Sequence, residues 1–445
     1  MEAFDVVVVG GGPGGSAAAL AAARDGASVV LLEADDQLGG NAARSTGYLA
    51  FADFEMQADH GGDDTSEDFL ADMQAEIDRQ KHRYGLIFDE DLARRYAEES
   101  AATYQELIEL GFRFDRFLPR PVQHTVDRMV SVADTAMFTT CFEPALAEAG
   151  VDIRYRTRAV RLLQDGDRVS GVITDTCRHF EAANGVILAA GGYQANPDLR
   201  TRFQPEAKAT TPYLGTELCR GDGHIMGLAV GGDLINMTMI PPLVMVGSAL
   251  VEDAIAVNRD GHRFHDEAGP YDDRVAALEA QPDQQAWYVF DNRVAKDKAQ
   301  LVAEMPEPAV SGADPAELAA AIGCDANSLS QTLGRWNQTV KSGTDRDPEF
   351  GRVIFGQPRT GIVEPPLWAA PMVVGINFPA GGFRVNADMQ VLDVFGYPIA
   401  GLFAVGDCVG GVSPAIGLGG VKITAALTLG RIAGQAIASQ VSAGR

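Results

Sequence analysis

The sequence contains few cysteines, and none stands at a spacing typical of a metal site or a disulfide framework. Its five cysteines are scattered through 445 residues, and no C-x-x-C pair occurs. Zinc sites and disulfide-rich domains both depend on closely spaced cysteines or histidines. We therefore predict no metal site and no disulfide framework. The cysteines are Cys141, Cys177, Cys219, Cys324 and Cys408.

Basic residues are also scarce. The chain has 36 lysines and arginines against 61 aspartates and glutamates, a formal net charge of −25 at pH 7. Such a charge repels nucleic acids and anionic membranes, so neither is expected as a partner. No uninterrupted apolar run is long enough to span a bilayer. Since no targeting segment precedes the first expected strand, at about residue 4, we expect a cytoplasmic protein.

The length and the apolar content indicate a globular protein of two domains. Hydrophobic residues make up 46% of the sequence, and the mean hydropathy is −0.03. These values fit a soluble chain with a sizeable core. A single core rarely organises more than about 300 residues, so a chain of 445 residues is expected to divide.

The first 33 residues have the pattern of a dinucleotide cradle. A short apolar run ends at Gly10, and Gly10-x-Gly12-x-x-Gly15 then leads into an alanine-rich helix. Gly10 permits the tight turn, Gly12 lets a pyrophosphate approach the backbone, and Gly15 lets helix and strand pack closely. Glu33 ends the next expected strand, where a carboxylate accepts hydrogen bonds from ribose hydroxyls and repels a 2′-phosphate. The pattern therefore favours a dinucleotide other than NADP.

Two later glycine-rich segments are expected near the same dinucleotide. The loop that follows Glu33 is rich in small and polar residues, which suit close approach to a flat ring; an ordinary surface loop is the alternative. The strand that begins at Gly185 ends in a further glycine loop, as strands of a doubly wound sheet do beside a cofactor. The candidate cofactor residues are Gly40, Asn41, Thr46 and Gly47 in the first segment and Ala190 and Gly191 in the second.

The C-terminal segment has a second glycine-aspartate loop that runs into a helix. It comprises 401–411, with Asp407 in a Gly-Asp pair, and 415–420, which reads Ala-Ile-Gly-Leu-Gly-Gly. A chain that returns to its dinucleotide some 390 residues later is typical of FAD enzymes. Asp407 is expected on the ribityl or ribose of the cofactor, and Leu418 beside the isoalloxazine, where small neighbours permit close approach.

The middle of the chain has two kinds of segment. Residues 65–110 show apolar side chains at helical spacing and are expected to form core helices. Residues 120–128 form a polar loop with Arg120, His124 and Arg128, which either faces the active site or is simply solvated. From about 236 to 364 proline, acidic and turn residues become frequent, so this segment is the candidate cap over the cofactor.

These segments together resemble the fumarate reductase and succinate dehydrogenase flavoprotein superfamily, which includes 3-ketosteroid dehydrogenases. The resemblance covers nearly the whole chain and includes Gly221-Asp-Gly and the stretch 257–264, Val-Asn-Arg-Asp-Gly-His-Arg-Phe. It implies an α/β fold: a discontinuous Rossmann-like FAD-binding domain, residues 1–235 and 365–445, with an inserted α+β capping domain, 236–364. It also implies FAD as cofactor. Because 41–48 contains no histidine, we expect the FAD to be non-covalent.

The resemblance is weaker to the branch that reduces dicarboxylates. That branch uses a cap arginine as proton donor, where this sequence has Tyr271. Its tail arginine is replaced here by Gly417, and its histidine before the returning strand by Phe378 or Pro379. A dianion in a pocket without paired cations carries a large desolvation cost. These three differences are evidence against a fumarate or succinate enzyme.

The pattern Glu-Ala-x-Pro-Tyr that ends at Tyr271 is similar to the ketosteroid dehydrogenase branch. In that branch the tyrosine after proline is catalytic, and a tail tyrosine and a backbone N–H polarise the ketone oxygen. Gly420 matches the backbone position, whereas Ile416 stands where the tail tyrosine is expected. The resemblance thus implies chemistry beside a ketone but leaves open whether the substrate is a steroid.

Desaturation beside a ketone needs a base, an oxyanion stabiliser and a hydride acceptor. Tyr271 is the candidate base and Gly420 the candidate oxyanion stabiliser. Ionising a tyrosine of ordinary pKa at pH 7 costs about 4 kcal/mol, so we expect help from His124, Arg128 or Tyr48. A substrate carboxylate, if present, is expected on Arg120 or Arg128.

We therefore predict an FAD-dependent dehydrogenase that introduces a C=C bond α,β to the carbonyl of a cyclic ketone, such as an oxocyclohexanecarboxylate or a 3-ketosteroid. Two alternatives remain. One is a reductase that runs the same chemistry backwards on an enone or enoate. The other is an electron-carrying flavoprotein subunit, although the sequence has no cysteine cluster or haem motif of its own. The sequence does not identify the electron acceptor: oxygen, a quinone and a carrier protein are all compatible with it.

Overall fold

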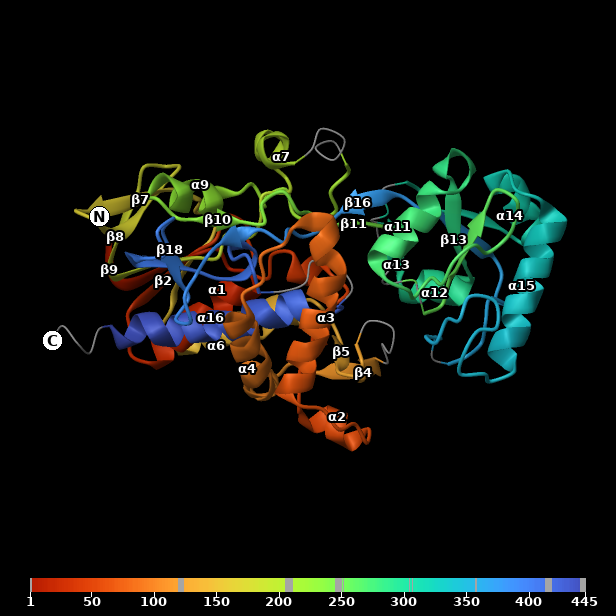
Figure 1. The fold of residues 1–445 in the computed structure, drawn as a ribbon, viewed down its shortest axis with the longest axis horizontal. Helices are drawn as coiled ribbons and strands as arrows, with labels where there is room; N and C mark the ends of the chain where they lie inside the picture. Colours follow the sequence, from red (N-terminus) through yellow and green to blue (C-terminus); the bar gives the residue numbers. More distant parts are fainter. Residues whose placement is uncertain are drawn as a thin grey trace.

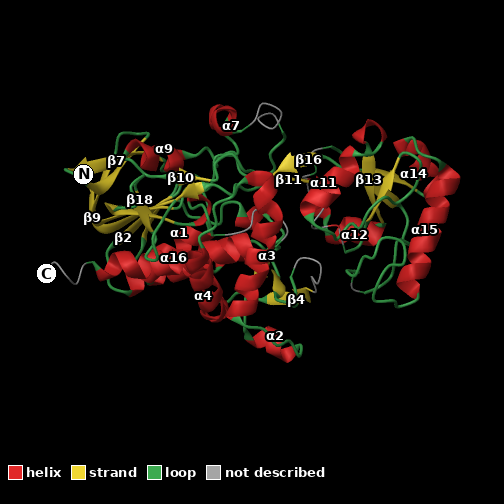
Figure 2. Cartoon of the chain, in the orientation of Figure 1, coloured by secondary structure: helices red, strands yellow, loops and turns green. Residues whose placement is uncertain are grey.

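The computed structural model describes residues 2–118, 124–204, 211–244, 250, 252–303, 305, 307–356, 358–412 and 418–440. Two lobes lie side by side along the long axis, a larger one that contains both ends of the described chain and a smaller one, the cap (Figure 1). The expected α/β fold is confirmed: the larger lobe is built on a mainly parallel sheet with helices packed on it (Figure 2).

The central sheet of the larger lobe contains strands from both the N-terminal and the C-terminal parts of the chain. Its order is β18-β19-β9-β1-β2-β6, and β8 joins β9 to β7 at one side. β1 runs parallel to both β2 and β9, and β9 runs parallel to β19. The strands are β1 (Glu2–Val9), β2 (Val29–Leu32), β6 (Asp152–Arg154), β7 (Ala159–Asp165), β8 (Arg168–Thr174), β9 (His179–Leu188), β18 (Gln390–Leu392) and β19 (Pro398–Ala404).

The last helix, α16 (Val421–Ser439), packs directly on the first, α1 (Pro13–Arg24), so the two ends of the chain form one layer (Figure 1). Glycine makes this close approach possible, because a Cβ on Gly430 would lie 2.3 Å from the carbonyl oxygen of Gly14. The tail segment therefore returns to the opening loop, as the sequence predicts.

Further helices cover this layer. α3 (Ser66–Tyr84) and α4 (Glu90–Glu109) pack on each other, and α4 also packs on α16. Phe69, Met73 and Leu107 are at most 1% exposed, which confirms their assignment to the core. The remaining helices of this lobe are α2 (Glu55–Asp59), α5 (Met137–Thr140), α6 (Phe142–Glu148), α7 (Pro197–Phe203) and α9 (Asp222–Ala229), with short 3₁₀ turns η1 (Ala42–Arg44) and η3 (Gly406–Cys408).

Small sheets extend the larger lobe toward the cap. β5 lies between β3 and β4 in a three-stranded antiparallel sheet, and β10 pairs with β17. β11 and β16 form an antiparallel pair that carries the chain into the cap and back (Figure 1). These strands are β3 (Tyr48–Ala50), β4 (Phe114–Leu118), β5 (Met129–Val132), β10 (Leu234–Ile235), β11 (Pro242–Val244), β16 (Val374–Ile376) and β17 (Gly382–Phe383).

The cap is an antiparallel sheet of order β12-β13-β15-β14 with helices on both faces. Tyr288 and Phe290 of β13 pack with Val275 and Leu278 of α11, and Val289 points to the opposite core with α14 and α15. The cap elements are β12 (Ile255–Asn258), β13 (Ala286–Phe290), β14 (Val310–Gly312), β15 (Leu367–Pro371), α11 (Tyr271–Glu279), η2 (Pro282–Gln284), α12 (Asn292–Asp297), α13 (Ala299–Ala303), α14 (Pro315–Ile322) and α15 (Ala326–Lys341).

The boundaries at 236 and 364 stay a prediction. β15 continues the cap sheet to Pro371. β10, which ends at Ile235, pairs with β17 and so belongs to the larger lobe. The sheet pairing itself therefore extends the cap beyond residue 364. No simple sequence signal marks the crossing from β15 to β16, because both strands read as short apolar runs.

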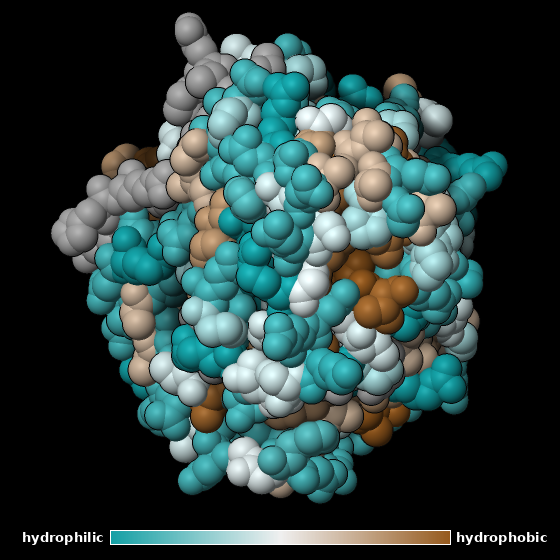
Figure 3. Space-filling model, turned by 90° about the vertical axis from the view of Figure 1, so that its right-hand side faces the viewer, coloured by the Kyte–Doolittle hydropathy of each residue, from teal (hydrophilic) through white to brown (hydrophobic). Residues whose placement is uncertain are grey.

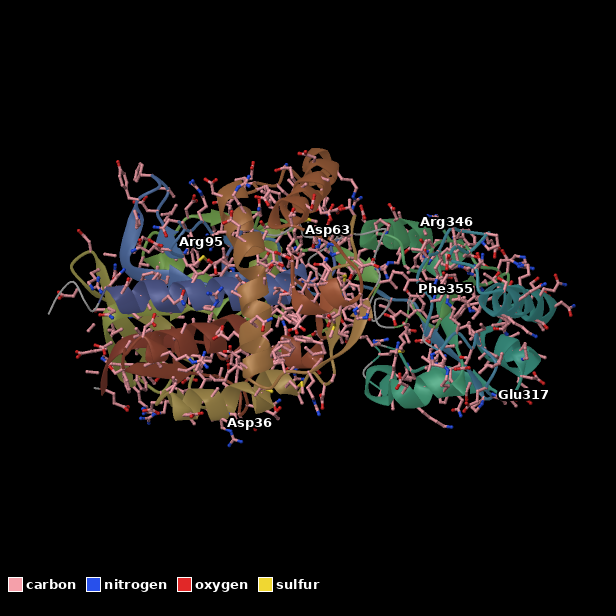
Figure 4. All side chains as sticks on the ribbon, turned by 90° about the horizontal axis from the view of Figure 1, so that it is seen from below. Asp36, Asp63, Arg95, Glu317, Arg346 and Phe355 are labelled. Carbon is pink, nitrogen blue, oxygen red and sulfur yellow. The ribbon has the colours of Figure 1, made fainter. Side chains whose placement is uncertain are left out.

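The outer surface is largely charged and polar. The face of the cap that Figure 3 shows is mainly hydrophilic, with small hydrophobic clusters between the polar side chains. Figure 4 places Asp36, Asp63 and Arg95 on the larger lobe and Glu317 and Arg346 on the cap. Among the helices of the described residues, none combines the length and the apolar character that a bilayer crossing requires.

Candidate active site

A cavity of about 520 Å³ is lined by residues from the opening loop, the tail and the cap. It brings together most of the residues that the sequence analysis singled out. Gly15, Gly47, His124 and Arg128 are not among the residues that line it. The expected residues that line it are Gly10, Gly12, Glu33, Gly40, Asn41, Thr46, Ala190, Gly191, Tyr271, Asp407, Leu418 and Gly420.

The first glycine loop forms an open cradle at the N-terminus of α1. Gly10 has φ +104°, and a Cβ there would lie 2.4 Å from the carbonyl oxygen of Ala189, so only glycine fits. A Cβ on Gly12 would meet nothing within 4 Å, because Gly12 faces the cavity. Gly15 has a packing role instead: its Cβ would lie 1.9 Å from the oxygen of Gly10. The helix N-terminus is thus left accessible to a phosphate.

Glu33 lines the cavity beside this cradle. Its Oε2 accepts a hydrogen bond from the Gly11 N–H at 2.6 Å, and its Oε1 accepts one from the Asp35 N–H at 2.7 Å. Burial raises the pKa of Glu33, and these two N–H groups oppose the rise. The carboxylate is therefore fixed at the end of β2, where it can also accept hydrogen bonds from a ribose.

The loop after β2 forms the opposite wall. A Cβ on Gly40 would lie 3.6 Å from the Cα of Gly12, so these two glycines face each other without side chains between them. Asn41 donates to the hydroxyl of Tyr213 at 3.0 Å and accepts from the Thr216 N–H at 2.9 Å. Gly47 lies against the three-stranded sheet, since its Cβ would be 2.3 Å from Val132, and so it shapes the loop rather than the cavity.

The tail closes the cavity from the side of α16. Gly420 is the N-cap of α16 with φ +78°, and a Cβ there would lie 2.6 Å from the backbone of Leu49. Asp407 lies in η3 with its Oδ1 3.6 Å from the Nζ of Lys422, which also lines the cavity. Burial raises the pKa of Asp407, and the ammonium group of Lys422 opposes this. Ile416 and Gly417 lie outside the described residues.

Arg128 has its carboxylate partners away from the cavity, whereas His124 contacts Gly419, which lines it. Arg128 is fully buried and binds Asp64 at 2.8 Å and Asp72 at 2.7 Å, while its guanidinium lies over the ring of Phe69. His124 is 2% exposed, and its Nε2 lies 3.0 Å from the carbonyl oxygen of Gly419. Neither side chain lines the cavity, and their catalytic roles stay a prediction: His124 contacts the segment before α16, and Arg128 binds Asp72 of α3. Arg120 lies outside the described residues.

Tyr271, the first residue of α11, is the cap residue that the sequence singled out at this cavity. Its ring packs near Ile77 and Met239 of the larger lobe. The guanidinium carbon of Arg274 lies 4.4 Å from the centre of the same ring. Arg274 is 2% exposed, and its Nε and Nη1 atoms have no hydrogen-bond partner among the described residues. Tyr271 therefore stands between the cavity and a buried cation.

The loop before Tyr271 is fixed by a buried ion network. Glu267 is fully buried and accepts hydrogen bonds from Arg263 at 2.7 and 2.9 Å and from Arg352 at 3.2 Å. Burial alone would raise the pKa of Glu267, but the two guanidinium groups lower it to about 2. The Arg-Phe-x-x-Glu pattern of the sequence thus positions the loop that presents Tyr271.

Three further polar side chains line the cap end of the cavity. Arg116 binds Glu252 at 2.6 Å, and the hydroxyl of Tyr48 donates to the same carboxylate at 3.3 Å. Lys298 binds Asp253 at 3.1 Å. The sequence analysis considered Tyr48 but missed Arg116, Lys298 and Lys422, since none of the three belongs to a recognisable motif. The one signal was at Lys422, where a basic residue in the first turn of a helix opposes the helix dipole.

The cavity fits FAD. Two glycine segments, a helix N-terminus and a carboxylate at the end of β2 line one part of the cavity, and residues of the tail and the cap line the rest. This arrangement can bind a pyrophosphate, a ribose and a planar ring in sequence. The substrate then has to bind between that ring and Tyr271.

Comparison with known proteins agrees with this geometry. A family model described as "FAD binding domain" matches residues 5–423. The chain is 31% identical, over 92% of its length and 70% of the relative, to a probable fumarate reductase of Shewanella frigidimarina. It is 27% identical, over 79% and 69%, to a 4-oxocyclohexanecarboxylate 2-dehydrogenase of Sinomonas cyclohexanicum. The alignments with several other relatives cover only 48% to 51% of those proteins.

A solved structure of a 3-ketosteroid-delta4-(5alpha)-dehydrogenase from Rhodococcus jostii RHA1 is also similar. It superposes with a TM-score of 0.70 at 25% identity and covers 98% of this chain and 97% of that one. The similarity therefore extends over both lobes.

Proposed function

The chain belongs to the FAD binding domain family and is an FAD-dependent oxidoreductase that acts on carbon–carbon bonds, and on this premise we propose that it desaturates a cyclic ketone beside the carbonyl group. The observation that supports this choice is Tyr271. Its side chain lines the cavity from the cap, opposite the walls that fit FAD. A phenol in this place can exchange a proton with a substrate carbon.

In the proposed reaction, Tyr271 first loses its hydroxyl proton to solvent, and the resulting phenolate takes up a proton from the carbon next to the carbonyl group. Bound FAD supplies the acceptor for the hydride from the neighbouring carbon. The buried guanidinium of Arg274, whose carbon lies 4.4 Å from the ring centre of Tyr271, stabilises the phenolate before it takes up this proton. Arg274 is thus proposed as a residue that supports Tyr271.

The negative charge that develops on the ketone oxygen needs hydrogen-bond donors. Gly420 lines the cavity as the N-cap of α16, so the free N–H groups of the first turn begin there. The positive end of the helix dipole adds to their effect. We therefore retain Gly420 as the proposed oxyanion stabiliser, with the backbone of α16 in the role that a tyrosine and a backbone N–H have in the ketosteroid branch.

The charges at the cap end favour a ketone over a dicarboxylate. Among the described residues that line this end, Arg116 and Lys298 are the cations, and each already binds a carboxylate of this chain, Glu252 and Asp253. The four groups together carry no net charge, so they would offset little of the desolvation cost of a dianion. A neutral ring ketone, or one with a single carboxylate, fits this balance better.

A reductase that runs the same chemistry backwards is the second candidate. It is favoured by the 31% identity to a probable fumarate reductase. In this direction a neutral Tyr271 donates a proton to a C=C bond next to a carbonyl group, and the same residues are used.

Anaerobic mixing of the flavin-loaded protein with candidate substrates separates the two functions. The panel contains 4-oxocyclohexanecarboxylate, a 3-ketosteroid and succinate, and the flavin absorbance is followed. We expect a ketone to bleach the flavin and to yield an enone. Bleaching by succinate alone would overturn the proposal. If no compound bleaches the flavin, whereas an enone or fumarate reoxidises the chemically reduced protein, the reductase would be the correct function.

A further inference from the structure

Lys422 is a partly buried lysine for which the proposed reaction gives no role. It lies in the first turn of α16, directly after Leu418–Gly420, and its Nζ is 3.6 Å from Asp407 and 5.8 Å from the centre of the Phe378 ring. Its side chain is 22% exposed and that of Asp407 is 21% exposed, and both line the cavity. A ligand that fills the cavity therefore takes both groups out of water.

The position of this lysine is unfavourable for the helix alone. A cation in the first turn opposes the positive end of the helix dipole, and burial lowers the pKa of Lys422 while Asp407 opposes that change. Residues around it on α16, such as Ala425 and Ala426, are small and apolar. A lysine kept in such a place needs an anionic group nearby, and Asp407 supplies it.

We propose that Lys422 raises the reduction potential of bound FAD by placing a positive charge beside the isoalloxazine end of the cavity. Hydride transfer brings two electrons and one proton to the flavin, so one negative charge is added on reduction. An ammonium group in a site without water stabilises this added charge more than it would in solution. The inference depends on FAD binding and not on the identity of the substrate.

The test is a redox titration of the purified, flavin-loaded protein without substrate. In Lys422→Gln the side chain can still donate a hydrogen bond to Asp407, so the loop is expected to stay folded, but the charge is removed. We expect the equilibrium between oxidised and reduced flavin to shift at least tenfold toward the oxidised form. For a two-electron couple this is a potential lower by about 30 mV. Lys422→Arg keeps the charge and is expected to restore most of the potential.

Lys296→Gln is the matched control. Lys296 is 70% exposed on α12 and binds Glu364 at the surface, so its loss should leave the potential unchanged. A Lys422→Gln protein with the potential of the wild type would overturn the proposal, and so would a drop of equal size in Lys296→Gln. If Lys422→Gln purifies with little FAD, the comparison between wild type and Lys422→Arg decides. A charge-dependent effect requires that the equilibrium constants between oxidised and reduced flavin in these two proteins agree within a factor of about three.

Discussion

Tyr271→Phe tests the proposed reaction most directly, because it removes one oxygen atom and keeps the ring. No hydrogen bond from the hydroxyl to a described residue is present, and the ring packs near Ile77 and Met239 with the Arg274 guanidinium 4.4 Å away. Phenylalanine keeps these contacts. We therefore expect the free energy of unfolding to change by no more than about 1 kcal/mol and the FAD content to stay that of the wild type.

The expected loss is in the chemical step. A positioned acid or base contributes about 10²- to 10⁴-fold to the rate, which corresponds to about 3 to 5 kcal/mol of barrier. Two explanations for a slow variant have to be separated, a lost proton transfer and a displaced cofactor. Only the first leaves the flavin spectrum and the redox potential unchanged, since the residues that fit FAD belong to the larger lobe.

The assay is stopped-flow flavin reduction by 4-oxocyclohexanecarboxylate under anaerobic conditions. Tyr397→Phe is the matched control, since Tyr397 is 71% exposed on the larger lobe and away from the cavity. We expect Tyr271→Phe to be slower by at least 100-fold and Tyr397→Phe to be normal. A Tyr271→Phe enzyme that reduces its flavin within tenfold of the wild-type rate would refute the role of Tyr271 as base.

Three further predictions concern the fold and the cofactor. Gly15→Ala places a Cβ 1.9 Å from the oxygen of Gly10, so the purified protein should lack flavin absorbance; normal FAD content would contradict the packing argument. Arg128→Met leaves two buried carboxylates without their cation and should cost about 3 to 5 kcal/mol in urea denaturation, whereas unchanged stability with lost turnover would restore a catalytic role. Burial lowers the pKa of His224 to about 4, so the folded protein keeps this imidazole neutral above that pH. The unfolded chain binds a proton on the same imidazole at about pH 6.5. The free energy of unfolding should therefore fall by up to about 3 kcal/mol as the pH falls from 6.5 to 4. His224→Phe should remove that dependence, and an equal pH dependence in both proteins would show that another group titrates.

The parts of the site that could be predicted from the sequence are those that follow local rules. Gly10 has to be glycine because of its backbone geometry at a strand-to-helix turn, Gly12 leaves the cavity open to a pyrophosphate, and such turns have a fixed spacing in the sequence. Tyr271 was found through a motif whose spacing is preserved in this chain. The structure adds the reason for that spacing: Glu267 is fixed by Arg263 and Arg352, so the loop that leads to α11 has a defined length.

The residues whose surroundings the sequence did not indicate depend on contacts between distant parts of the chain. His124 and Arg128 stand in a polar loop, which suits an active site as well as a structural ion pair. The partners of Arg128, Asp64 and Asp72, precede it by 64 and 56 positions, and nothing in the local pattern indicates the pairing. A buried arginine is explained only once its carboxylates are known.

The division of the site between the lobes determines how its mutations can be interpreted. The walls that fit FAD come from the larger lobe, whereas Tyr271 comes from the cap, which two strands, β11 and β16, connect to it. Substitutions such as Gly15→Ala should therefore lower FAD content and turnover together. Substitutions such as Tyr271→Phe should lower turnover alone. Lys422→Gln belongs to a third class, because it should change the potential of FAD without removing the base. If the three variants instead lost FAD and turnover in equal proportion, the separation of binding, proton transfer and redox tuning among these residues would be wrong, even though the fold would stand.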